Sequence, residues 1–126
     1  MATPQAQYEK MMDEYRKIQN DISTTIESRQ KLESQLQENK IVQKEFSVLD
    51  EDSKIYKLIG PVLVPQDRPE AVMNVDKRLE FIESEIKRVE NQIKDTQSKA
   101  DKQRSEILAF QAKIQESAGG PAPIQA

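Results

Sequence analysis

Two long segments of the chain place apolar residues at alternating steps of three and four, which is the spacing of a coiled-coil seam. The first segment covers residues 4–49, and its seam positions are Tyr8, Met11, Tyr15, Ile18, Ile22, Thr25, Arg29, Leu32 and Leu36. The second covers residues 68–116, and its seam positions are Val72, Val75, Leu79, Ile82, Ile86, Val89, Ile93, Thr96, Ala100, Gln103, Ile107, Phe110 and Ile114. In the first segment the seam weakens beyond Leu36 and slips in phase before it returns at Phe46. The pattern predicts two long coiled-coil helices.

Start and stop signals support both helices. Thr3 can cap the first helix, and Pro4 suits its first turn. Asp67, with Glu70 three residues later, has the spacing of an acidic cap on the second helix. Residues 117–126 are rich in Gly and Pro, so we expect the second helix to end there in a disordered tail.

The short connection at residues 53–66 has a different character, because its two halves favour strand and Gly60-Pro61 separates them. This pattern predicts a β-hairpin that folds the second helix back, antiparallel to the first. Apolar residues occupy both faces of the expected hairpin, whose members are Ile55, Tyr56, Leu58, Ile59, Gly60, Val62, Leu63 and Val64. A lone hairpin of this kind is marginal in water and leaves its edges unpaired. We therefore expect it to pair with hairpins of other chains.

Two alternatives to this interpretation remain. The connection could be an apolar loop that needs no partner, or each helix could pair with a helix of another chain. The second alternative leaves the short hairpin without a role, so the antiparallel coiled coil within one chain is the simpler interpretation. Because the hairpin in this interpretation needs strands of other chains, we expect the protein to be an obligate subunit of an assembly.

Apolar residues outside the seam lie near the two ends of the expected coiled coil, apart from Ile26 in the middle. Scattered exposed apolar residues are common on protein surfaces, so they could also have no function. Near the hairpin lie Ile41, Val42 and Phe81, which we interpret as base contacts with neighbouring subunits. Near the opposite end, Met12 and Leu108 lie off the seam. They accompany seam residues in the outermost turns of the helices, namely Tyr8, Met11, Tyr15, Phe110 and Ile114. Methionine and aromatic side chains suit loose contacts with varied apolar partners, although core packing is the commoner role of each alone.

Composition disfavours several classes of function. The 126 residues include no Cys and no His, while 36% are hydrophobic and 33% are charged. Disulfides and thiolate zinc sites are thereby excluded, and the commonest general base and metal ligand is missing. We expect no enzyme, metal or cofactor, although a catalyst built from Asp, Glu, Lys, Ser and Tyr remains an alternative. The acidic turn at residues 50–52 is interpreted as solvated, because it lacks the glycine and spaced ligands of a calcium loop.

Charge and hydropathy disfavour two kinds of partner. The net charge of −3 is spread evenly, and no basic tract is available for phosphates, so we expect no nucleic acid partner. No apolar run approaches the about 20 residues of a membrane span, so we expect no membrane partner. We expect the protein in the cytosol.

The hairpin carries a family resemblance. Its sequence from Ile55 to Val64, IYKLIGPVLV, together with a helix on either side, resembles the β-type subunits of prefoldin. Four further stretches resemble one β-type subunit in particular: RQKLE at 29–33, ENKIV at 38–42, KRL at 77–79 and EIKR at 85–88. The likeness covers residues 8 to about 115, and the hairpin motif is its most specific part.

This resemblance implies a hetero-hexamer with two α-type and three further β-type subunits, whose hairpins form intersubunit β-barrels. It implies an ATP-independent chaperone that captures unfolded chains, notably actin and tubulin, and delivers them to the cytosolic chaperonin. The family grips its clients at the ends of the coiled coils, which correspond here to Tyr8, Met11, Met12, Tyr15, Leu108, Phe110 and Ile114. Two rival functions remain: a structural tether, and a prefoldin-like scaffold subunit without direct client binding. The tether has no use for a hairpin that is apolar on both faces.

Overall fold

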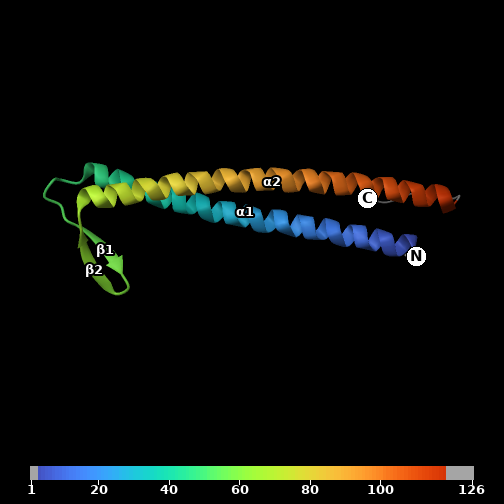
Figure 1. The fold of residues 1–126 in the computed structure, drawn as a ribbon, viewed down its shortest axis with the longest axis horizontal. Coiled ribbons are helices and arrows are strands. Elements are labelled where there is room, and N and C mark those ends of the chain that lie inside the picture. The colour runs from blue at the N-terminus through green and yellow to red at the C-terminus, as the bar shows by residue number, and fades with distance from the viewer. Residues whose placement is uncertain (1–2, 119–126) are drawn as a thin grey trace. The chain divides into compact units, whose positions relative to one another are not determined.

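The computed structural model describes residues 3–118, which form two helices and one hairpin in the order α1, β1, β2, α2 (Figure 1). Helix α1 spans Pro4–Val48, strand β1 Ile55–Ile59, strand β2 Val62–Gln66 and helix α2 Arg68–Ala118. The fold is therefore mainly α with a single β-hairpin at the connection, as predicted. Helix α1 ends one residue earlier than expected. Residues 117 and 118 belong to α2, and the rest of the expected disordered tail, 119–126, lies outside the described residues.

The chain divides into two compact units. We call Ser28–Glu90, which contains the hairpin, the hairpin unit. The terminal unit consists of the residues up to Glu27 and from Asn91 onward. In each unit a segment of α1 lies beside a segment of α2 that runs in the opposite direction (Figure 1).

Both helices begin where the capping signals predict. The Thr3 hydroxyl oxygen accepts a hydrogen bond from the Ala6 N–H at 3.1 Å, and the Thr3 carbonyl accepts one from Gln7 at 3.0 Å. At the start of α2, the Asp67 carbonyl accepts a hydrogen bond from the Ala71 N–H at 2.9 Å. The bond to the Thr3 hydroxyl satisfies a donor that the first turn of a helix leaves without a partner, whereas the two carbonyl bonds are the first regular bonds of each helix.

The hairpin unit has a continuous apolar seam between its two helix segments. Its core consists of Leu36, Leu79, Ile82 and Ile86, against which Leu32 and Val75 pack. Polar pairs continue the seam on either side of this core. Arg29 Nη2 donates to Glu90 Oε1 at 2.8 Å, and Gln43 Nε2 donates to Asp76 Oδ1 at 2.8 Å.

In the terminal unit the seam is thinner and contains more polar groups. Its buried apolar residues are Ile22, Ala100 and Ile107. Farther along, Gln103 Nε2 donates to the Met11 carbonyl at 3.1 Å, and Gln111 Nε2 donates to the Tyr8 hydroxyl at 2.8 Å. The unit is therefore held by hydrogen bonds between helices as well as by apolar packing. These bonds confirm that residues near the start of α1 meet residues near the end of α2.

The two strands pair antiparallel across a two-residue turn. The paired residues are Ile55 with Gln66, Tyr56 with Pro65, Lys57 with Val64, Leu58 with Leu63, and Ile59 with Val62. Gly60 has a φ of 59°, and no residue other than glycine among those described has a positive φ. A turn with positive φ only at its first central residue is type II′, which matches the right-handed twist of the strands. Gly60 is therefore required here, because an L side chain is strained at this φ.

Candidate functional site

Arg68 anchors the base of the hairpin to the end of α1. Its Nη2 donates to the carbonyls of Phe46 and Leu49, both at 2.8 Å, and its Nη1 donates to the Asp50 carbonyl at 3.0 Å. The last carbonyls of a helix have no partners within the helix, and a cation also interacts favourably with the negative end of the helix dipole. The first residue of α2 thus caps α1. Sequence reasoning missed this contact, because Arg68 reaches the end of α1 only after the chain has turned back through the hairpin.

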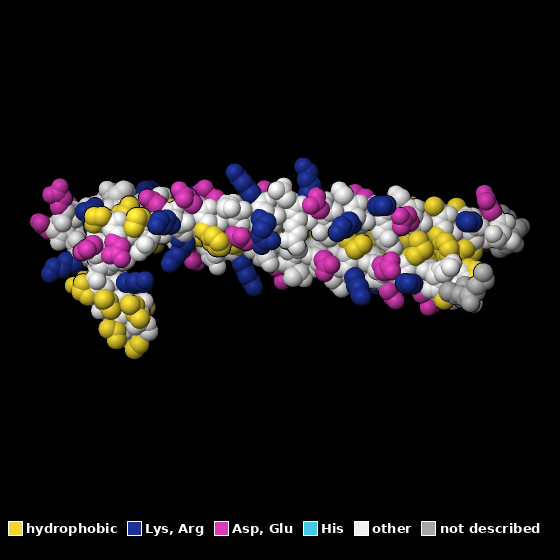
Figure 2. All heavy atoms as spheres, viewed as in Figure 1, with side chains coloured by type: hydrophobic (Ala, Val, Ile, Leu, Met, Phe, Trp, Pro, Cys, Tyr) yellow, Lys and Arg dark blue, Asp and Glu magenta, His cyan; other side chains and the backbone are white. Residues whose placement is uncertain are grey.

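Both faces of the hairpin are apolar and open to solvent. Paired residues share a face, so Leu58 and Leu63 lie on one face and Ile59 and Val62 on the other. Leu58 is 67% exposed and Leu63 62%, and the other strand residues predicted for oligomerisation are also exposed, apart from Ile55, which is buried. Figure 2 shows hydrophobic side chains gathered over the hairpin. A contiguous exposed apolar surface of this kind is typical of a site that contacts another molecule, such as a protein, a membrane or a ligand.

The residues predicted to contact neighbouring subunits near the hairpin differ in how exposed their side chains are. Ile41 and Phe81 are exposed, whereas Val42 is half-buried within its own unit. Two further apolar side chains of the hairpin unit, Val48 and Met73, are also exposed. Sequence reasoning did not single these two out. Val48 is seven residues after Ile41 and so repeats its position on α1, a spacing that could have been noticed.

The predicted client-binding residues fall into two groups. Leu108 is 50% exposed, while the other members are half-buried in the terminal unit: Tyr8, Met11, Met12, Tyr15, Phe110 and Ile114. The half-buried residues thus share their surface between the partner helix and solvent. Ile26, at 39%, is the one other large apolar side chain of this unit that is counted as exposed among the described residues. The unit therefore offers several partly exposed apolar groups rather than one open patch.

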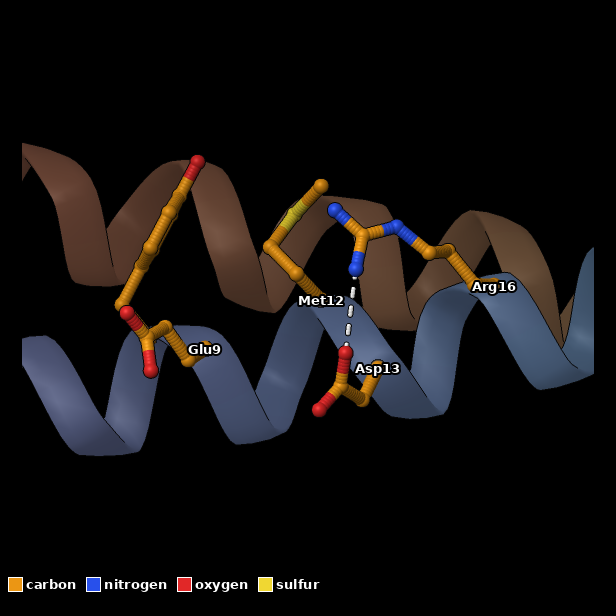
Figure 3. Close-up of a pocket in the computed structure, with 5 residues that line it drawn as sticks. Glu9, Met12, Asp13 and Arg16 are labelled. Carbon is orange, nitrogen blue, oxygen red and sulfur yellow. Dashed lines mark hydrogen bonds and ion pairs between the residues drawn. The ribbon is translucent and has the colours of Figure 1, made fainter.

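A shallow hollow of about 290 Å³ lies on α1 near its start, lined by Tyr8, Glu9, Met12, Asp13 and Arg16. Figure 3 shows the side chains of Met12 and Arg16 close to each other, with an ion pair between Arg16 Nη1 and Asp13 Oδ1 at 3.0 Å. The volume is at the lower limit of small-molecule sites, which span about 300–1,000 Å³.

Charged side chains are frequent throughout residues 3–118. No group of three or more Asp and Glu side chains comes together there as a metal site. The Glu85 carboxylate accepts a hydrogen bond from Arg88 and raises the pKa of that guanidinium. None of the helices that the structure describes could cross a membrane.

Comparison with known proteins agrees with the resemblance in the hairpin. The profile of the prefoldin subunit family (Prefoldin_2) matches residues 9–114. Prefoldin subunit 6 of Saccharomyces cerevisiae is 55% identical over 94 residues, which is 75% of this chain and 82% of the yeast protein. Prefoldin subunit 6 of Mus musculus is 41% identical over 115 residues, or 91% of each chain. The resemblance to one β-type subunit in particular is thus confirmed as a likeness to subunit 6.

A solved structure has the same fold. The crystal structure of the prefoldin β subunit from Thermococcus strain KS-1 superposes with a TM-score of 0.75. The match covers 86% of this chain and 96% of the archaeal one at 23% identity, so it supports the fold alone. Taken with the profile match and the two relatives, this shows that the chain belongs to the prefoldin subunit family, as a co-chaperone subunit that has the fold of the β type and is similar to subunit 6.

Proposed function

We propose that this chain is the subunit-6-like member of a cytosolic hetero-hexameric prefoldin. Its partners are two α-type and three further β-type subunits, and its hairpin is part of an intersubunit β-barrel. The complex holds unfolded polypeptides, such as nascent actin and tubulin, at the ends of its coiled coils. It delivers them to the cytosolic chaperonin without using ATP.

The hairpin is the single observation that carries the assembly. Leu58, Leu63, Ile59 and Val62 are all more than half exposed, on both faces of an isolated two-stranded sheet. Covering a large aliphatic side chain contributes about 1.5–3 kcal/mol, and such a sheet is marginally stable without further partners. Strands of other subunits would cover these faces and pair with the free edges.

Client binding is supported by the surface of the terminal unit. Leu108 lies outside the seam and is half exposed, and Met12 forms part of the hollow on α1. A chaperone must bind many sequences, and flexible methionine and aromatic side chains adapt to varied apolar segments. Weak contacts of this kind, repeated on six arms, give useful affinity by avidity without a deep pocket.

The decisive experiment removes this apolar surface and leaves the coiled coil in place. We expect hexamers with the double variant Met12→Gln and Leu108→Gln to suppress aggregation of denatured actin less well than wild type. Ile26→Gln is the matched control, because Ile26 is an exposed apolar residue of the same unit but lies away from the chain ends. Sizing of the same samples checks that the hexamer is intact.

The outcome separates the chaperone from its nearest rival. Loss of protection in an intact hexamer supports client binding at the helix ends. Full protection by hexamers in which the helix ends of every subunit have been truncated, for this chain at residues 1–15 and 107–126, would rule these ends out. A loss of protection that occurs only when the hexamer dissociates would favour a scaffold subunit without direct client binding.

ATP independence has its own test. Residues 3–118 contain no glycine loop that could hold a phosphate, since Gly60, the glycine in that range, lies in the hairpin turn. Capture of denatured actin by purified complex, without chaperonin, is expected to be equal with and without ATP. Capture that requires added ATP would contradict this part of the proposal.

A further inference from the structure

The outer edges of the two strands do not offer the same backbone groups. In a hairpin with a two-residue turn, the residues that flank the turn exchange both N–H and C=O hydrogen bonds, and bonded and non-bonded pairs then alternate. Ile59 and Val62 flank the turn, so Leu58–Leu63 and Tyr56–Pro65 are non-bonded pairs. The N–H and C=O groups of non-bonded pairs point away from the hairpin, toward any strand that joins its edge.

Pro65 makes the two edges unequal. It has no N–H, and its place in a non-bonded pair opposite Tyr56 means that the hairpin itself loses no hydrogen bond. The outer edge of β1 offers N–H donors from Tyr56 and Leu58. The outer edge of β2 offers one from Leu63 and none from Pro65, which lies two residues farther on.

We propose that the outer edge of β1 forms the longer ladder with a strand of a neighbouring prefoldin subunit, and that Pro65 ends pairing on the β2 edge. This inference rests on the hexamer assembly proposed above. It adds that the β1 edge of the hairpin, rather than the β2 edge, forms the main contact with the neighbouring strand. Proline on an edge strand is a known protection against unwanted pairing. The hairpin thereby has one extended pairing edge and one restricted edge.

The chemistry of the strand points to a different subunit rather than a second copy of this chain. Two β1 strands that pair with Tyr56 opposite Leu58 place Lys57 directly against its own copy. Like charges directly opposite each other are destabilising. Because both faces of the hairpin are apolar and exposed, the partner strand should carry apolar residues on both faces and no lysine opposite Lys57.

The register supplies a matched pair of variants for the test. Leu58 and Leu63 are the same residue type, lie opposite each other, and are 67% and 62% exposed. Leu58→Pro removes one outward N–H from β1, and Leu63→Pro removes one from β2, while neither removes a bond within the hairpin. Leu58→Ala and Leu63→Ala lose the side chain but keep the N–H. The contrast between proline and alanine at each site therefore isolates the backbone donor.

The measurement is incorporation into the hexamer after co-expression with the other subunits, read by size exclusion and native mass spectrometry. We expect Leu58→Pro to lower incorporation about tenfold below Leu58→Ala, because the partner strand is left with an unsatisfied buried acceptor. Leu63→Pro should stay within about twofold of Leu63→Ala, because its edge contributes a shorter ladder. Circular dichroism of each free chain should show unchanged helix content.

The other possible results distinguish the inequality of the two edges from assembly through the hairpin. Equal losses from both prolines, or a greater loss from Leu63→Pro, would overturn the inequality of the edges and leave assembly through the hairpin standing. Full incorporation of both prolines would overturn the inference and the hairpin-mediated assembly together.

Pro65→Val provides an independent measurement on the free chain. It restores an outward N–H on β2 and should increase self-association in sizing experiments, because an unprotected edge pairs with further copies. An unchanged size distribution would show that Pro65 is not what restricts this edge.

Discussion

The hairpin unit and the terminal unit expose apolar residues in different ways. In the hairpin unit the helices bury a continuous core around Leu79 and Ile82, whereas the strands expose nearly all of their apolar side chains. In the terminal unit most apolar side chains near the helix ends are half-buried, and polar residues such as Gln103 interrupt the seam. An apolar surface that is largely exposed in the free chain favours a permanent partner. An apolar surface that is already half covered gains less from a partner, so it can bind that partner and let it go again. The contrast therefore fits the proposed functions, namely stable assembly at the hairpin unit and transient client binding at the terminal unit.

The strongest test of this comparison places a charge on each face of the hairpin. Tyr56 and Val62 lie on opposite faces, and both are at least half exposed in the free chain. The double variant Tyr56→Asp and Val62→Asp should abolish incorporation into the hexamer, since burying an unpaired carboxylate is costly. Helix content by circular dichroism should stay near wild type.

Ile26→Asp is the control for this test, because it adds the same charge at an exposed apolar residue of the terminal unit. This variant should assemble normally. A hairpin double variant that co-elutes with the hexamer at wild-type yield would remove the distinction between a permanent and a transient surface.

The second test compares the two seams by equal truncations. Ile82 is 3% exposed in the hairpin unit, whereas Ile18 is half-buried in the terminal unit. Ile82→Ala should lower the free energy of unfolding by about 2–5 kcal/mol, because it leaves a cavity in a packed core. Ile18→Ala should cost less than half as much. Urea unfolding of the free chain, followed by circular dichroism, measures both, and equal losses would contradict the difference in packing.

The third test concerns the cap at the base of the hairpin. Arg68→Ala leaves one carbonyl in the last turn of α1 and two just after it without their charged donor, and should destabilise the hairpin unit by about 1–3 kcal/mol. Arg68→Lys should recover part of this loss, because an ammonium group cannot reproduce the planar fork of the guanidinium. Hydrogen exchange at the last turn of α1 should rise in both variants. Unchanged exchange in Arg68→Ala would show that the cap contributes nothing to local stability.

The smallest expected effect is at the ion pair between Arg29 and Glu90. Their side chains are 38% and 48% exposed, so solvent and salt screen the pair. A double-mutant cycle with Arg29→Gln and Glu90→Gln should give a coupling free energy of about 0.2–1 kcal/mol that falls as salt is added. A coupling that is larger and insensitive to salt would mean that the pair sets helix register more strongly than its exposure indicates.

The seam was predictable from the sequence because it depends on local periodicity. Each predicted seam position in α2, from Val72 to Ile114, is buried or half-buried in the structure. The start at Thr3 and the turn at Gly60 also follow from short-range preferences, for a side-chain cap and for a positive φ. The hairpin sequence further identified the family, since its motif is much more specific than the heptads.

Other features depend on how distant residues meet. In α1, Val42 is half-buried, whereas Gln43 is exposed and donates a hydrogen bond to Asp76 of α2. The predicted client-binding residues did not form one open patch, since all of them except Leu108 are half-buried. Periodicity alone does not say how far a neighbouring helix shields a residue near the end of a seam.

The sequence by itself determined two seams, a hairpin that is apolar on both faces, and the absence of histidine and cysteine chemistry. These are properties of residue order, and short-range sterics and hydrophobicity act on them directly. Only the tertiary structure decided that Arg68 caps α1 and that Leu108 stays exposed while the other predicted client-binding residues are half-buried. Both depend on which distant residues meet when the chain returns on itself, and local residue preferences do not act over that distance.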